Sequence, residues 1–132
     1  MTGSLARFEP VAYAALRIVA GAMFLCHGLS KVLGWLGPAK EVGSQLWIGG
    51  VIELVAGGLI ALGLFTRPAA LIASGTMAVA YFQFHWKLGM DNWQWLPMVN
   101  KGELAVLYCF LFLLIALRGA GIASLDQLRG RR

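Results

Sequence analysis

Four long apolar runs constrain the fold of this 132-residue chain more than any other feature of its sequence. They cover approximately residues 13–33, 47–65, 69–86 and 101–118, and the uninterrupted apolar part of the last begins only at Leu104. Each run is about 18 to 21 residues long, the length a helix needs to cross roughly 30 Å of hydrocarbon. The sequence therefore predicts an all-α, single-domain polytopic membrane protein, in which four transmembrane helices form an antiparallel bundle.

Composition supports this class and excludes others. The chain is 59% hydrophobic and only 13% charged, whereas about a quarter of the residues in a soluble domain are charged. The net charge of +5 does not indicate nucleic-acid binding, because the basic residues sit at helix ends and in the C-terminal tail. The first run is too long for a signal-peptide core and is expected to be retained. Cys26 and Cys109 lack metal or redox spacing, so they are interpreted as apolar filler and no metal is expected.

Basic residues also predict the orientation. One side of the membrane would hold Arg7, Arg17, Arg67, Arg118, Arg129, Arg131 and Arg132, and the other Lys31, Lys40, Lys87 and Lys101. The excess places both termini in the cytoplasm. All five tryptophans then fall on the outer face, which indicates an interface or a ligand rim as well as anchoring.

The connection between the second and third runs is only three residues long, Thr66-Arg67-Pro68. So short a link predicts that the two helices are antiparallel neighbours, with Thr66 as the N-cap of the helix over residues 69–86.

The first run carries three basic residues, Arg17, His27 and Lys31. At about 100° per residue they fall within an arc of roughly 80°. His27 and Lys31 are one helical turn apart, so their side chains can meet. Because charged groups are costly in hydrocarbon, this stripe should face the bundle interior or a wet cavity.

Comparing depths brings further polar residues to the same level. At 1.5 Å per residue, His27 and Glu53 each lie about 9 Å below the outer ends of their helices, and Lys31 about 3 Å. His85 ends the third helix and Glu103 opens the fourth, so both lie near the outer surface. The sequence thus predicts a small-molecule pocket in the outer leaflet half, and its candidate binding residues are His27, Lys31, Glu53, Tyr81, His85 and Glu103.

Structural roles remain open for each of these residues. Glu53, the only charge in its helix, either binds a ligand or pairs with Lys31 or His27 to hold helices together. The alternatives are snorkelling for Lys31 and Arg17, helix capping for Glu103, an interfacial position for His85 and bundle packing for Tyr81.

The chain resembles the DoxX family of small four-helix membrane proteins. The resemblance is carried by His27-Gly-Leu-Ser-Lys31-Val-Leu-Gly-Trp35, by residues 52–67 (IELVAGGLIALGLFTR), by Asn100-Lys-Gly-Glu103-Leu-Ala-Val-Leu-Tyr108 and by residues 119–126 (GAGIASLD). It covers about residues 16–126 and implies a bacterial cytoplasmic-membrane protein associated with redox complexes such as quinol oxidases. It also implies shared polar positions at His27, Lys31, Glu53, Asn100 and Glu103.

Three functions follow from these observations. The first is a redox-associated subunit, with or without catalytic turnover, whose outer pocket holds a quinone headgroup, because quinone carbonyls need hydrogen-bond donors and a proton route. The second is a non-catalytic scaffold or assembly subunit that uses its outer tryptophans to bind membrane or periplasmic protein subunits within the lipid bilayer. A transporter is less favoured, since the inner half offers no polar path beyond Arg17.

Overall fold

The structure, a computed structural model, describes residues 2–130, and it is all-helical over that range. Arg131 and Arg132, which the orientation argument used, lie outside the described residues. The elements are α1 (Thr2–Ala6), α2 (Glu9–Leu33), α3 (Gln45–Leu62), α4 (Thr66–Ala80), the π-helix η1 (Tyr81–Trp86), the 3₁₀-helix η2 (Asp91–Trp93), α5 (Pro97–Asn100), α6 (Glu103–Arg118) and α7 (Leu125–Gly130).

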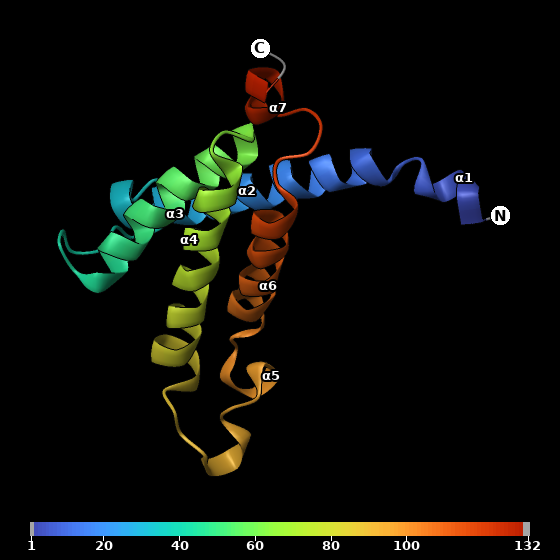
Figure 1. The fold of residues 1–132 in the computed structure, drawn as a ribbon. Helices are drawn as coiled ribbons and strands as arrows, with labels where there is room; N and C mark the ends of the chain where they lie inside the picture. Colours follow the sequence, from blue (N-terminus) through green and yellow to red (C-terminus); the bar gives the residue numbers. More distant parts are fainter. Residues whose placement is uncertain (1, 131–132) are drawn as a thin grey trace.

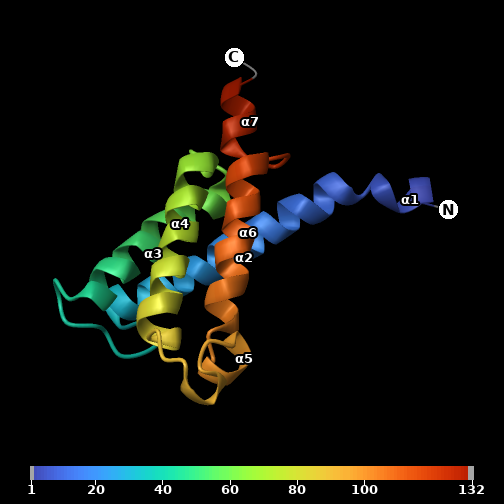
Figure 2. The same cartoon turned by 60° about the horizontal axis from the view of Figure 1, so that its bottom comes forward.

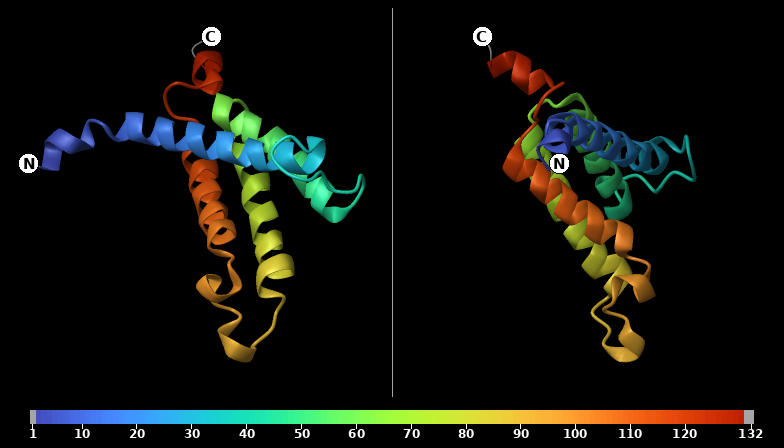
Figure 3. Two further views of the ribbon diagram at one scale, coloured as in Figure 1. Left: turned by 180° about the vertical axis from the view of Figure 1, so that it is seen from behind. Right: turned by 90° about the vertical axis from the view of Figure 1, so that its right-hand side faces the viewer.

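The four long helices form two helical hairpins that cross one another. α2 packs most extensively on α3, and α4 on α6, while α3 and α4 share a smaller contact. Figures 1 and 2 show the α4–α6 hairpin running across the α2–α3 hairpin and projecting beyond it, with α1 extending away from the rest. Figure 3 shows the same crossing from behind and from the side. The link between α3 and α4 consists of residues 63–65, because the expected link Thr66-Arg67-Pro68 forms the first turn of α4. This link joins the two hairpins.

The helix ends differ from the sequence expectations at several points. α2 begins at Glu9 rather than near residue 13, and α3 ends at Leu62, where Gly63 adopts a left-handed conformation. α4 passes directly into η1, which carries the helix on to Trp86. Thr66 is not an N-cap, because that position is taken by Phe65. By length and composition, α2 and α3 are apolar enough to cross a membrane.

Glycines allow α2 and α3 to approach closely. A Cβ added at Gly28 would lie 2.3 Å from the backbone nitrogen of Leu54, and one at Gly57 would lie 2.4 Å from that of Leu25. Both distances are too short for any side chain, so these positions are in backbone-to-backbone contact. Gly49, one turn before Glu53, has open space beside it instead.

The core forms where the hairpins cross, and aromatic rings fill it. Tyr108 and Phe112 of α6 stack with centroids 5.2 Å apart and an interplanar angle of 7°. Phe24 of α2 packs against both, at 5.5 Å and 4.7 Å. Phe24 and Phe112 are almost completely inaccessible to solvent. This cluster fixes α2 against α6.

Charged side chains satisfy three helix ends at the junction of the hairpins. Arg17, which is fully buried, donates to the carbonyls of Ile60 and Ala61 at the end of α3 and to Ile122 and Ala123 before α7. Arg67 donates to the last carbonyls of α6. Asp126 accepts from the first N–H groups of α4. The terminal carbonyl and N–H groups of a helix lack partners within that helix, and these side chains supply them. The contacts of Arg17 and Asp126 also hold the C-terminal segment against α3 and α4.

Candidate functional site

The site begins with an ion pair between α2 and α3. Nζ of Lys31 lies 2.6 Å from Oε1 of Glu53, and the two side chains are 26% and 4% exposed. The stem of Lys31 packs on Gly50, whose missing side chain leaves room for it. A carboxylate this deeply buried needs a partner of opposite charge, and Lys31 provides it from the neighbouring helix.

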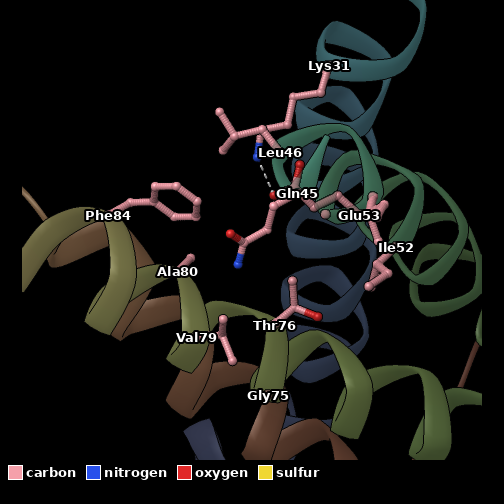
Figure 4. A pocket seen from close by; sticks show the side chains of 12 residues that line it. Lys31, Gln45, Leu46, Ile52, Glu53, Gly75, Thr76, Val79, Ala80 and Phe84 are labelled. Atoms are coloured by element: carbon pink, nitrogen blue, oxygen red, sulfur yellow. Dashed lines mark hydrogen bonds and ion pairs between the residues drawn. The ribbon is translucent and has the colours of Figure 1, made fainter. Parts of the chain in front are cut away.

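A groove between α3 and α4 opens beside this ion pair, with a volume of about 400 Å³. Figure 4 shows the ion pair, marked by a dashed line, on one side of the groove and Phe84 of η1 on the opposite side. Gln45 and Thr76 add polar groups to a lining that is otherwise apolar. The amide of Gln45 donates to Gln83, which joins the start of α3 to η1.

Tyr81 and His85 lie elsewhere, in contact with the loop that links η1 to α6. The Tyr81 hydroxyl donates to the carbonyl of Trp95 and accepts from the amide of Asn100. Nδ1 of His85 lies 3.3 Å from the carbonyl oxygen of Asn100, whose side-chain oxygen accepts from the N–H of Gly102. These contacts hold the loop in place, and neither Tyr81 nor His85 lines the groove beside Glu53.

His27 and Glu103 are also separate from the ion pair. His27 is exposed and lines a second groove along the outer side of α2, with its ring edge-on to Tyr108 at 6.4 Å. Glu103 is exposed in the first turn of α6, after Gly102 as N-cap. Of the six predicted binding residues, only Lys31 and Glu53 are brought into direct contact.

Several residues of the site were not singled out from the sequence. Gln45, Thr76 and Phe84 line the groove because α3 and η1 converge there, and only the position of Glu53 on α3 gave a hint of this. Tyr108 is 5% exposed, yet its hydroxyl has no hydrogen-bond partner among the described residues. Because Tyr108 lies in a long apolar run, its sequence context indicates only a residue that packs in the hydrophobic core.

The ion pair can bind a polar group at the edge of an apolar groove. An ammonium group has three donors, and only one of those of Lys31 is directed at Glu53. The others can reach an acceptor such as a carbonyl oxygen. Among residues 2–130, no three His, Cys, Asp or Glu side chains gather closely enough to hold a metal ion.

Comparisons with known proteins identify one family and several relatives. The sequence pattern of the DoxX family matches residues 12–86. An uncharacterized protein of Haemophilus influenzae is 44% identical over 94% of this chain and 95% of its own length. The inner membrane protein YphA of Escherichia coli is 31% identical over 90% and 91%, and the "Putative oxidoreductase CatD" of Bacillus subtilis is 28% identical over 84% and 81%. No solved structure matches the chain.

Proposed function

Because the chain belongs to the DoxX family, we propose that it binds a quinone-like molecule in the groove beside Lys31 and Glu53, as a redox-associated subunit. Its relatives include proteins of the bacterial inner membrane. The observation that carries this proposal is a buried ion pair at the edge of an apolar groove. In this arrangement Lys31 donates to a quinone carbonyl oxygen, Glu53 orients the Lys31 ammonium, and Phe84 covers the ring.

The groove has the size and chemistry that such a ligand requires. Small-molecule pockets typically enclose about 300–1,000 Å³ and combine an apolar lining with a few placed polar groups. The groove of about 400 Å³ falls within that range, and Ile52, Val79 and Ala80 provide apolar walls. One relative carries the name of an oxidoreductase, which is consistent with redox chemistry.

The proposal places four membrane passes around this groove, as two antiparallel hairpins with both termini in the cytoplasm. Large apolar side chains are exposed along all four long helices, including Val19, Val55, Ile72 and Leu107, and lipid would cover them. Arg17 and Arg67 lie at the junction near the C-terminal segment, as expected for the cytoplasmic side.

Quinone titration of the purified protein tests this function. A short-chain ubiquinone is added to protein in nanodiscs, and binding is followed by quenching of tryptophan fluorescence. We expect saturable binding that weakens at least tenfold in Glu53→Gln and Lys31→Met. Glu103→Gln, which changes an exposed carboxylate outside the groove, is the matched control and should bind normally. Absence of saturable binding by the unaltered protein would rule the proposal out.

A scaffold function is the second candidate, and one observation favours it. Trp93 and Trp95 lie with ring centroids 6.1 Å apart in the loop beyond η1, and they are 65% and 42% exposed. Exposed tryptophans are typical of protein interfaces. Co-purification of membrane proteins with the unaltered chain, lost in Trp93→Ala/Trp95→Ala but kept in Glu53→Gln, would favour the scaffold over the quinone site.

A further inference from the structure

A second polar position lies behind the ion pair, inside the helix packing. Oε1 of Glu53 is bonded to Lys31, but Oε2 is buried and has no partner among the described residues. The hydroxyl of Tyr108 is in the same condition. Glu53 is 3% exposed and Tyr108 5%, so neither oxygen can be satisfied by bulk solvent.

These two oxygens come from different helices that face the same stretch of α2. Gly28 of α2 packs against the backbone of Leu54, next to Glu53. Phe24, one turn earlier on α2, packs against the ring of Tyr108. His27, next to Gly28 on α2, also lies edge-on to the Tyr108 ring, with centroids 6.4 Å apart. Both unpartnered groups therefore belong to residues that pack around the same turn of α2, from Phe24 to Gly28.

Their chemistry is complementary. A phenol donates one hydrogen bond and accepts others, whereas an ionised carboxylate only accepts. Nearly all buried polar groups in proteins have a partner, from the protein or from an ordered molecule. An oxygen that both accepts and donates, such as that of water or of an alcohol, can satisfy Tyr108 and Glu53 together.

We infer that Glu53 Oε2 and Tyr108 Oη form a second binding position for a single hydroxyl-bearing group, behind the Lys31–Glu53 groove. The Tyr108 hydroxyl donates to the bound oxygen, and the bound oxygen donates to Oε2. Tyr108 is thus a further binding residue, and Glu53 is shared between the groove and the interior.

This inference extends the proposed quinone site, but its bound group is not the quinone. If the protein binds no quinone while Tyr108 still influences Glu53, only the function proposed above fails. If quinone binds and Tyr108 has no influence on Glu53, only the second position fails. The experiment therefore observes Glu53 directly, without added quinone.

Infrared spectroscopy of the full-length protein in nanodiscs provides that observation. The carboxylate band of Glu53 is assigned by subtracting the spectrum of Glu53→Gln. We expect this band to shift in Tyr108→Phe, which removes the hydroxyl and keeps the ring beside Phe24. Tyr13→Phe is the matched control: it removes another buried hydroxyl, bonded to the carbonyl of Gly119, and should leave the Glu53 band in place.

Isotope exchange separates the two sources of the bound oxygen. An O–H band that moves in H₂¹⁸O and disappears in both Tyr108→Phe and Glu53→Gln identifies water. If the Glu53 band depends on Tyr108, does not shift in H₂¹⁸O and is lost after lipid extraction, the bound oxygen belongs to a lipid hydroxyl. If Tyr108→Phe does not fold, the C–O band of ring-labelled tyrosine is compared between the unaltered protein and Glu53→Gln. An unchanged Glu53 band in folded Tyr108→Phe, or an unchanged tyrosine band in Glu53→Gln, overturns the inference.

Discussion

Lys31 and Glu53 form an asymmetric ion pair, in which Nζ lies 2.6 Å from Oε1 while Oε2 has no partner among residues 2–130. Glu53 is the more buried partner, at 4% exposure against 26% for Lys31. The cost of separating the pair therefore falls mainly on the carboxylate. Because of this asymmetry, we expect the Lys31→Met and Glu53→Gln variants to differ in stability.

Lys31→Met should destabilise the protein more than Glu53→Gln does. It leaves a buried carboxylate without its countercharge, a change that costs on the order of 3 kcal/mol, whereas Gln leaves a partly exposed lysine that solvent can reach. The double variant should recover part of the loss. Thermal unfolding in detergent, analysed as a double-mutant cycle, measures the coupling. Equal losses for the two single variants with no coupling would contradict the ion pair.

Arg17 should be essential for the attachment of the C-terminal segment. Its guanidinium bonds four carbonyls of α3 and the stretch before α7, and the side chain is 0% exposed. Lysine cannot reproduce that planar fork. We expect Arg17→Lys to cost about 2–3 kcal/mol and to expose the tail to protease. Arg7→Lys, which changes an exposed arginine of the N-terminal segment, is the control and should leave cleavage unchanged.

Much of the architecture is visible in the sequence because apolar run length and turn residues are local signals. Gly34, in the left-handed conformation, ends α2 at Leu33, where the first apolar run was expected to end. Gly63, also left-handed, ends α3 three residues before the expected end of the second run. The close approach of α2 and α3 is not local. It depends on which glycines meet the backbone of the facing helix, and Gly57 does while Gly49 does not, although both are spaced four residues from Glu53.

The site was predictable in part for the same reason. Depth along a helix can be counted from sequence, and it placed both Lys31 and His27 in the same outer half as Glu53. Lys31 is the one that meets Glu53, although His27 was placed nearer to its depth. Rotation between hairpins cannot be counted, and it decides that His27 faces outward and that Tyr81 and His85 bind the η1–α6 loop. Tyr108 stood in the sequence only as the end of a family motif and was not predicted as a site residue, since one hydroxyl in an apolar run resembles core packing.

Asp126 should make stability depend on pH in acid. Burial raises the pKa of its carboxyl, but hydrogen bonds from Thr66 and the Phe65 N–H outweigh burial and lower it below the ordinary value of 3.8. The stabilisation is therefore complete above 3.8 and is lost as the pH falls through the folded-state pKa. Asp126→Asn should remove about 1 kcal/mol near neutral pH and flatten that acid slope. Unfolding curves between neutral and acid pH test this, and an unchanged slope in Asp126→Asn would exclude the cap as its source.

Two glycines of the α2–α3 contact should tolerate no side chain, while a third accepts one. A methyl group at Gly28 or Gly57 would meet the backbone of the facing helix at 2.3 Å or 2.4 Å, so the helices must separate. We expect Gly28→Ala and Gly57→Ala to cost about 2–3 kcal/mol each, as overpacked contacts do. Gly49→Ala, on the same helix as Gly57, meets nothing within 4 Å and should instead stabilise by about 0.5–1 kcal/mol through helix propensity. Thermal unfolding of the three variants measures the difference. A loss at Gly49 as large as that at Gly57 would mean that α2 and α3 do not pack as described.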